Sequence, residues 1–127
     1  MKYPHLFSPI EIAGMELRNR AVMPAMGTGY GNMDNTVSDR LVHFLKLRAR
    51  GGTGLVITEV CAVLPRGKGF SNELGAWSDD FIPTLAKIPE AIHEEGAKGP
   101  SSSTMPVARH FSQPPAPFPK RRPPFRA

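Results

Sequence analysis

Thiols and long apolar runs are scarce in this sequence. Cys61 is the single cysteine among 127 residues, so the chain can form no internal disulfide and no cysteine-rich metal site of its own. No stretch approaches the roughly 20 apolar residues that cross a bilayer, and the apolar run at the N-terminus is too short for a signal peptide. These absences predict a cytoplasmic protein with no membrane partner and no metal site.

Acidic side chains are missing from residues 99–127, whereas the rest of the chain has equal numbers of acids and bases. That segment holds 8 of the 14 prolines and five of the 16 basic residues, so the whole formal charge of +5 belongs to it. A basic chain often binds nucleic acid, but this body is electroneutral, and we expect no nucleic-acid partner. The segment also lacks any apolar period. We therefore predict two parts, a folded portion over 1–98 and a disordered, Pro-rich, basic tail over 99–127.

Short strands are predicted in the first 60 residues. Gly14-Met15 predicts the turn of a hairpin between residues 9–13 and 16–18. The apolar run 21–23 predicts a buried strand that ends at a proline. The run 54–60 is apolar almost throughout and predicts the strongest strand of the chain, in a sheet that is covered on both faces.

Two helices are predicted after these strands. Residues 36–39 resemble a capping box, apolar residues then recur at helical spacing, and Gly51-Gly52 ends the helix. A second helix begins at residues 78–80 and ends at Gly96. Pro89 lies in the middle of this second helix, where it is expected to cost about 3 kcal/mol or to force a kink.

The order strand, loop, helix, strand, loop, helix is typical of parallel βα units. Such units carry their chemistry on the loops that follow the strands. Two units cannot close a barrel, which needs eight units and roughly 250 residues. The pattern predicts an α/β protein in which residues 1–98 form part of a larger architecture.

Three ordered motifs resemble the Old Yellow Enzyme family of NADH:flavin oxidoreductases, which includes the barrel domain of 2,4-dienoyl-CoA reductases. The motifs are Leu-Phe-Ser-Pro-Ile at 6–10, Leu-Arg-Asn-Arg-Ala-Val-Met-Pro-Ala-Met at 17–26, and Arg-Ala-Arg-Gly-Gly-Thr-Gly-Leu-Val-Ile-Thr-Glu at 48–59. The resemblance covers residues 3–98. It implies the N-terminal part, a hairpin plus the first two βα units, of a (β/α)₈ TIM barrel. It also implies FMN as cofactor, NADH or NADPH as reductant, and a small-molecule acceptor such as an activated alkene.

The resemblance also implies which residues face the flavin. Pro24, Ala25, Met26 and Gly27 match the segment that lies along the isoalloxazine ring, where small residues and exposed backbone let a flat ring approach closely. Val60 matches the residue after the second strand that lies near the flavin. Gly27 stands where some relatives carry a redox-tuning cysteine or threonine, so we expect no such tuning here. No catalytic residue is assigned.

Four other residues with reactive side chains have simpler interpretations. Glu59, at a strand end, is expected to be a hydrogen-bonded structural carboxylate. His43 and His93 lie on predicted helices and are expected to be solvated or packing residues. Cys61 is expected to be an inert buried thiol.

The resemblance stops after Lys98, where the family continues with a third strand of approximate sequence Val-Gln-Leu-His-His-Ala-Gly-Arg. In that strand the Gln hydrogen-bonds the flavin pyrimidine. Here residues 100–108 differ, but a shift of frame restores the motif. If residues 101–104 are encoded by TCC, AGC, TCC and ACC, reading from each third base gives Gln-Leu-His-His, and Met105-Pro106 then gives Ala whatever the proline codon. We infer that the tail is an out-of-frame translation and that the chain is a truncated fragment.

Three functions follow from these observations. The first is an FMN-dependent NAD(P)H oxidoreductase that reduces activated alkenes or enoyl-type acceptors, represented by a fragment that is inactive alone. The second is a non-functional frameshifted product. The third is an interaction module, in which the PxxP run at 114–117 and the basic cluster at 120–122 bind an aromatic-lined groove or a polyanion.

Overall fold

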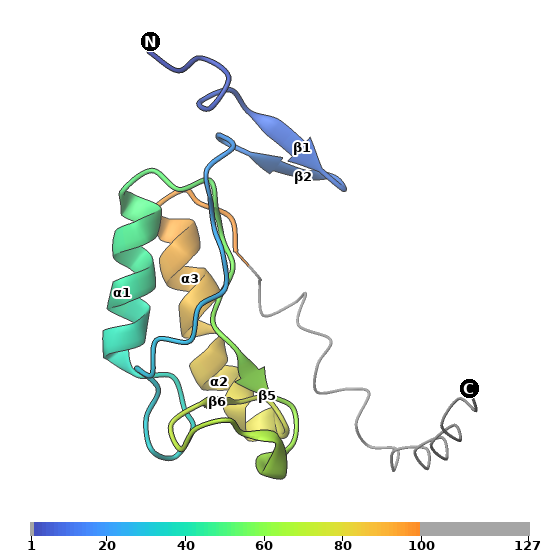
Figure 1. Ribbon diagram of the computed structural model, residues 1–127, viewed down its shortest axis with the longest axis vertical. Helices are drawn as coiled ribbons and strands as arrows, with labels where there is room; N and C mark the ends of the chain where they lie inside the picture. The colour runs from blue at the N-terminus through green and yellow to red at the C-terminus, as the bar shows by residue number, and fades with distance from the viewer. Residues whose placement is uncertain (1, 100–127) are drawn as a thin grey trace, which may run out of the picture.

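The computed structural model describes residues 2–99 (Figure 1). The predictions for the tail, including its disorder and its binding motifs, fall almost wholly outside these residues. The described chain contains, in order, β1 (Ile10–Ile12), β2 (Met15–Leu17), β3 (Val22–Met23), α1 (Asp39–Arg50), β4 (Leu55–Val56), β5 (Cys61–Ala62), η1 (Pro65–Gly67), β6 (Leu74–Gly75), η2 (Asp79–Phe81), α2 (Ile82–Leu85) and α3 (Lys87–Glu94).

The predicted hairpin is present, but its turn lies one residue earlier than expected. β1 and β2 pair antiparallel, with Ile12 opposite Met15, so the loop is Ala13-Gly14. Both loop residues have positive φ, 49° for Ala13 and 83° for Gly14. Two successive positive φ angles define the type I′ turn, which matches the twist of a two-residue hairpin. Glycine tolerates this conformation readily, and the alanine carries the steric cost.

Two parallel βα units follow the hairpin, as the order of elements predicted. β3 and β4 pair parallel, with Val22 opposite Leu55 and Met23 opposite Val56. On the other side of β4, Lys98 forms a parallel bridge with Leu55. The Val56 N–H donates to the Lys98 carbonyl at 2.8 Å, and the Lys98 N–H donates to the Gly54 carbonyl at 2.8 Å. Lys98 therefore pairs with β4 at the edge opposite β3.

The prediction of one strand over 54–60 was wrong in its extent. The ladder with β3 covers Leu55–Val56, and the last bond between the two strands runs from the Ile57 N–H to the Met23 carbonyl at 2.9 Å. The next residue after β3 is Pro24, which has no N–H to continue the ladder. Just after this run, β5 pairs instead with β6 in a separate parallel pair. An apolar run shows where a strand is buried but not where its partner ends.

The first predicted helix is confirmed, with its start shifted by two residues. Ser38, rather than Thr36, is the N-cap of α1, and its Oγ accepts from the Leu41 N–H at 3.1 Å. Gly51 is the C-cap, and Gly52 follows with a φ of 104°. The buried face of α1 consists of Leu41, Leu45 and Ala49.

The second predicted helix is broken in two, and this resolves the position of Pro89. α2 ends at Leu85 and α3 begins at Lys87, so Pro89 lies in the first turn of α3. Amide groups in a first turn have no carbonyl partner within their own helix, so a proline there removes no helical hydrogen bond. The expected penalty for a proline inside a helix therefore does not arise.

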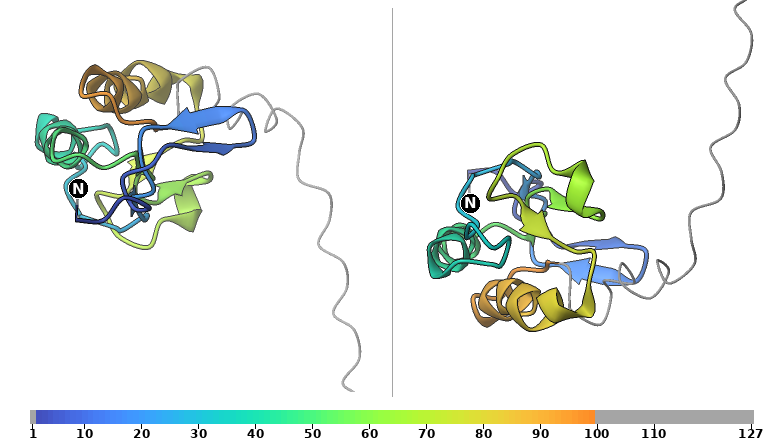
Figure 2. Two further views of the ribbon diagram at one scale, coloured as in Figure 1. Left: turned by 90° about the horizontal axis from the view of Figure 1, so that it is seen from above. Right: turned by 90° about the horizontal axis from the view of Figure 1, so that it is seen from below.

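The core lies between the two strands and the helices that follow them. α1 and α3 lie side by side on one side of the strands (Figures 1 and 2). The fully buried side chains between them include Leu41, Leu45, Val56, Ile88 and Ile92. The opposite faces of the strands carry Val22 and Ile57, each 45% exposed. The hairpin lies at one end of this layer, and the loops that contain β5 and β6 lie at the other end (Figure 1).

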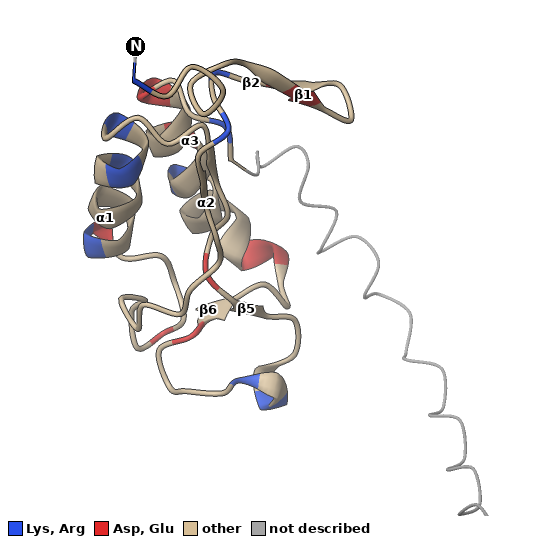
Figure 3. Cartoon of the chain, turned by 45° about the horizontal axis from the view of Figure 1, so that its top comes forward, with Lys and Arg blue, Asp and Glu red and all other residues tan. Residues whose placement is uncertain are grey.

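Charged residues are distributed unevenly over the helices. Figure 3 shows lysine and arginine residues gathered on α1, which carries Arg40, Lys46, Arg48 and Arg50. Lys46 Nζ lies 2.6 Å from Glu94 Oε2 on α3, and this contact raises the pKa of Lys46. Because both side chains are solvent-exposed, this ion pair joins the helices with little gain in stability.

Candidate functional site

The loop after β3 exposes four successive residues with no charged side chain. Pro24, Ala25, Met26 and Gly27 are all solvent-exposed, and Met26 keeps 53% of its surface accessible. Among residues 2–99, the backbone N–H groups of Ala25, Met26 and Gly27 donate no hydrogen bond. These amides are consequently available to an acceptor from outside the described chain.

Val60 lies beside this loop, although it follows a different strand. A Cβ atom built on Gly27 would lie 4.0 Å from Val60 Cγ1 and 3.8 Å from the Phe70 ring. Val60 is 48% exposed and Phe70 is 37% exposed. The structure thus brings together Gly27 and Val60 of the predicted set. Phe70 joins them, and the sequence did not identify it. We call these three residues the Gly27 cluster.

Glu59 fixes the backbone next to the Gly27 cluster. Its carboxylate is buried, and Oε2 accepts from the Thr28 N–H at 2.6 Å and from Thr28 Oγ1 at 2.5 Å. The other oxygen, Oε1, is buried with no hydrogen-bond partner among the described residues. The prediction of a structural, hydrogen-bonded carboxylate is confirmed by these contacts. Glu59 joins the loop after β3 to the loop after β4.

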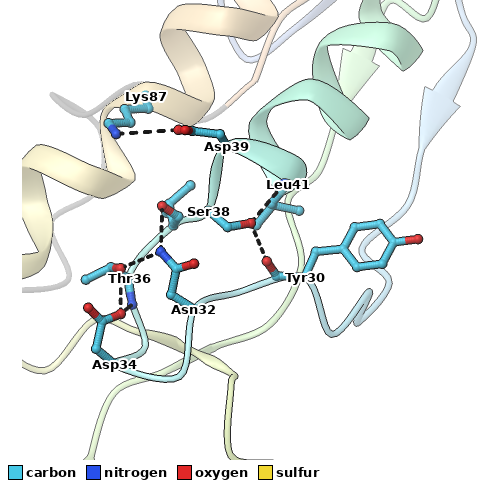
Figure 4. A network of polar contacts seen from close by, with 9 residues as sticks. Tyr30, Asn32, Asp34, Thr36, Ser38, Asp39, Leu41 and Lys87 are labelled. Carbon is cyan, nitrogen blue, oxygen red and sulfur yellow. Dashed lines mark hydrogen bonds and ion pairs between the residues drawn. The ribbon is translucent and has the colours of Figure 1, made fainter.

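A polar network then connects the loop to α1 (Figure 4). The Ser38 hydroxyl donates to the Tyr30 carbonyl and accepts from the Leu41 N–H, so one side chain both caps the helix and holds the loop. Asp34 accepts from the Thr36 hydroxyl at 2.6 Å and from the Thr36 N–H at 3.0 Å. These two bonds lower the pKa of Asp34.

The loop between β5 and β6 is held by two buried polar residues. Asn35 donates from Nδ2 to the Ser71 carbonyl at 2.8 Å and to the Glu73 carbonyl at 2.7 Å, and its Oδ1 accepts from Lys68 Nζ at 3.0 Å. Glu73 Oε2 accepts from the Gly69 N–H at 2.7 Å. Sequence reasoning missed Asn35 and Glu73. The signal for Asn35 is its place in an Asn-rich loop, since it adopts a φ of 68°, which asparagine tolerates.

Cys61 is partly buried, rather than fully buried as expected, and it begins β5. It is not in a disulfide, and its Sγ lies 3.7 Å from the Glu59 carbonyl oxygen. Burial, with smaller contributions from Glu59 and Glu73, raises the pKa of the Cys61 thiol to about 11. The thiolate, which is the nucleophilic form, is therefore scarce near neutral pH.

The motif at 17–20 is structural in this chain. Arg18 Nη1 donates to the Glu95 carbonyl at 2.9 Å, and Nη2 donates to the carbonyls of Ala49 at 2.5 Å and Thr53 at 2.9 Å. One guanidinium thus contacts the C-terminal ends of both α1 and α3. Asn19 is buried and donates to the Gly52 carbonyl at 2.7 Å.

The described residues hold no group of three or more His, Cys, Asp or Glu side chains that is placed to bind a metal ion. Nor is any of their helices long and apolar enough to cross a membrane. His43 is exposed on α1, and His93 Nε2 lies 3.3 Å from the Gly99 carbonyl oxygen.

Comparison with known proteins places the chain among flavin enzymes. The model of the NADH:flavin oxidoreductase / NADH oxidase family matches residues 5–99. An NADH oxidase from Thermoanaerobacter brockii is 41% identical over 97 residues, which cover 76% of this chain and 15% of that protein. An NADPH dehydrogenase from Bacillus subtilis is 38% identical over 95 residues, which cover 73% of this chain and 28% of that protein.

Solved structures agree with these relatives. A complex of 2-naphthoyl-CoA reductase with 2-naphthoyl-CoA matches with a TM-score of 0.74 at 31% identity and covers 76% of this chain and 15% of that chain. The old yellow enzyme from Trypanosoma cruzi matches with a TM-score of 0.68 at 30% identity and covers 78% and 26%, respectively. The predicted fold class is confirmed for the described residues: they are the hairpin and the first two βα units of a (β/α)₈ barrel.

Proposed function

The chain belongs to the NADH:flavin oxidoreductase / NADH oxidase family, and we propose that it forms one wall of the FMN site in an NAD(P)H-dependent oxidoreductase. The proposed wall consists of Pro24, Ala25, Met26, Gly27 and Val60. The chain spans 15% of the NADH oxidase and 28% of the NADPH dehydrogenase described above. The activity of the whole enzyme is therefore part of this proposal.

The absence of a side chain at position 27, which is glycine, is the main observation that supports the proposal. Gly27 has no positive φ that would demand glycine, and a Cβ there would meet its neighbours at ordinary contact distances. At Gly75, by contrast, a Cβ would lie 2.6 Å from the Phe81 ring, so packing excludes a side chain. Neither backbone conformation nor internal packing explains glycine at position 27. An exposed surface without a side chain, next to free backbone amides, suits the close approach of a flat ring.

The residues present fit a flavin in polarity as well as in shape. Val60 and Met26 offer apolar contacts to the ring, and the N–H groups of Ala25 to Gly27 can donate to its heteroatoms. Glu59 holds Thr28 and so keeps this backbone in place. FMN, when bound, would supply hydride transfer from NADH or NADPH to a small acceptor such as an activated alkene. The chain's own residues would position the ring and exclude water from one side of it.

A polypeptide of these 127 residues is proposed to be inactive by itself. The described residues provide two βα units, and family barrels place their phosphate site on later strands. We expect the purified chain to retain no FMN through gel filtration and to oxidise no NADH or NADPH. A yellow preparation that keeps about one FMN per chain would contradict this part of the proposal.

The family function is tested on the gene itself, by translating it in the frame that restores the third strand after codon 98. We expect that product to carry about one FMN per chain and to oxidise NAD(P)H with 2-cyclohexenone as acceptor. Gly27→Leu should weaken FMN binding by roughly tenfold or more, because the side chain fills the space of the ring. Gly67→Leu is the matched control, since Gly67 is exposed and a Cβ there meets Leu64 Cβ at 3.8 Å. Equal FMN affinity in both variants would refute the assigned wall.

A further inference from the structure

Phe70 is an exposed aromatic residue with no role in the core. It keeps 37% of its surface accessible and does not pack against the main cluster of buried residues. The aromatic pairs among the described residues are Tyr30 with Phe44 and Trp77 with Phe81, so Phe70 has no aromatic partner there. The exposed part of this ring forgoes the stabilisation that its burial would give.

The ring nevertheless has a defined place beside Gly27. Its Cε1 and Cζ atoms lie 3.8 Å from the position that a Gly27 Cβ would occupy. Gly27 belongs to the loop after β3, and Phe70 belongs to the loop between β5 and β6, so this approach joins two separate segments. The space beside Gly27 is therefore bordered by an aromatic side chain.

Hydrogen bonds on both sides of Phe70 hold its backbone in place. The preceding Gly69 N–H donates to Glu73 Oε2 at 2.7 Å, and the following Ser71 carbonyl accepts from Asn35 Nδ2 at 2.8 Å. Asn72 Nδ2 donates to the Gly29 carbonyl at 2.5 Å, which ties the two loops together. The backbone that carries Phe70 is thus ordered before any ligand binds, so less entropy is lost when one does.

We propose that Phe70 is a flavin-binding residue and that its aromatic side chain contacts the isoalloxazine ring where Gly27 leaves room. This inference rests on the proposed function and extends its flavin-binding wall to a residue on a third segment of the chain. Aromatic rings attract one another in offset or edge-to-face arrangements, and the flavin ring is a large conjugated plane. An aromatic side chain at position 70 supplies the contact that a larger residue at position 27 would otherwise make.

The test is equilibrium dialysis of the full 127-residue chain against FMN at concentrations up to about 1 mM, the range of weak binding. Such binding is too weak to survive gel filtration, so it agrees with the proposed inactivity of the chain. We expect Phe70→Ala to weaken FMN binding about 2- to 10-fold, which is the worth of one aromatic contact. Phe70→Leu keeps an apolar side chain but has no aromatic ring, so its affinity for FMN should lie between those of Phe70→Ala and the wild-type chain. Phe7→Ala is the matched control, because Phe7 is also exposed, at 47%, and precedes the hairpin.

Competition with inorganic phosphate shows whether the chain binds FMN through the isoalloxazine ring or through the phosphate group. We expect phosphate at the same concentration to leave FMN uptake unchanged. Circular dichroism of each variant shows whether it keeps the helices of the wild-type chain. Displacement of FMN by phosphate, equal uptake by Phe70→Ala and wild type, or no uptake by the wild-type chain would each overturn the inference. None of these results would overturn the proposed function, which is tested on the product of the restored frame.

Discussion

Glu59 and Cys61 are two residues apart and have different structural roles: Glu59 holds the backbone next to the Gly27 cluster, and Cys61 packs against the hydrophobic core. The Glu59 carboxylate accepts both donors of Thr28, next to Gly27. Cys61 begins β5 with its thiol protonated over most of the pH range. At the scale of single residues, Glu59 holds the loop after β3 in position, and the Gly27 cluster itself contains no titratable side chain.

Substitutions of Glu59 should separate the role of its shape from the role of its charge. Glu59→Leu leaves the two Thr28 donors without an acceptor, and we expect a loss of about 2–4 kcal/mol in the free energy of unfolding, since each unsatisfied buried group costs about 1–3 kcal/mol. Glu59→Gln keeps one oxygen for Thr28 and places its amide where Oε1 has no partner, so we expect a loss below about 1 kcal/mol. Urea denaturation measures both values. Equal losses in the two variants would contradict this account.

Cys61 should make the stability of the chain depend on pH in the alkaline range. Its folded-state pKa, about 11, lies above the ordinary value of 9.0. The unfolded thiol therefore loses its proton first, and the contribution of Cys61 is complete below about pH 9 and is lost as the pH rises toward 11. We expect the difference in unfolding free energy between wild type and Cys61→Ala to decrease across this range. A difference that stays constant from pH 7 to pH 11 would refute the raised pKa.

At the scale of elements, Arg18 links the two main helices to the hairpin end of the fold. Its guanidinium donates to carbonyls at the C-terminal ends of α1 and α3 and in the segment before β4. Three donors in a fixed planar arrangement make these contacts at once, which a lysine ammonium on a flexible stem cannot do. This geometry gives the arginine of the motif at 17–20 a structural role, and no catalytic role is needed to explain it.

We expect Arg18→Ala to lower the free energy of unfolding by about 1–2 kcal/mol, the usual range for hydrogen bonds to a charged group that stays partly solvated. Arg18→Lys should recover less than half of this loss. Arg20→Ala is the matched control, because the Arg20 side chain makes one hydrogen bond, from Nε to Ser8 Oγ at 3.2 Å. Thermal unfolding followed by circular dichroism measures all three variants, and an Arg20→Ala loss as large as that of Arg18→Ala would contradict the proposed link.

At the scale of the whole molecule, the described residues are an open part of a barrel. Val22 and Ile57, on the strand faces away from the helices, are each 45% exposed, although both are large apolar residues on paired strands. In a closed barrel such positions fill the interior, with side chains from all eight strands. Lys98 bridges Leu55 at the other edge of β4, which is the edge that a third parallel strand occupies in such a barrel.

The coding DNA should show how the family sequence continues. We expect the reading frame that encodes Gln-Leu-His-His across codons 101–104 to continue for roughly 200 further residues with six more βα units, as a complete barrel requires. Sequencing the gene through codon 98 and translating all frames is the measurement. An early stop codon or unrelated sequence in that frame would refute the frameshift and leave the interaction module as the remaining interpretation of the tail.

The sequence by itself determined the order of the elements, the hairpin, the ends of the first helix to within two residues, and the family. These features depend on local signals, such as glycines after helices, caps before them and apolar periods within them. Three motifs in order were enough to identify the family by resemblance, and the structure shows that two of their residues, Arg18 and Asn19, join separate segments of the chain.

Tertiary structure decided what depends on contacts between distant residues. The run 54–60 is paired with β3 only at Leu55–Val56, and β5, which begins just after the run, pairs with β6 instead. The second helix breaks so that Pro89 falls in a first turn. The meeting of Gly27, Val60 and Phe70 arises from three loops that carry no common sequence signal. Pairing and burial between segments far apart in the chain set these features, and no local pattern contains that information.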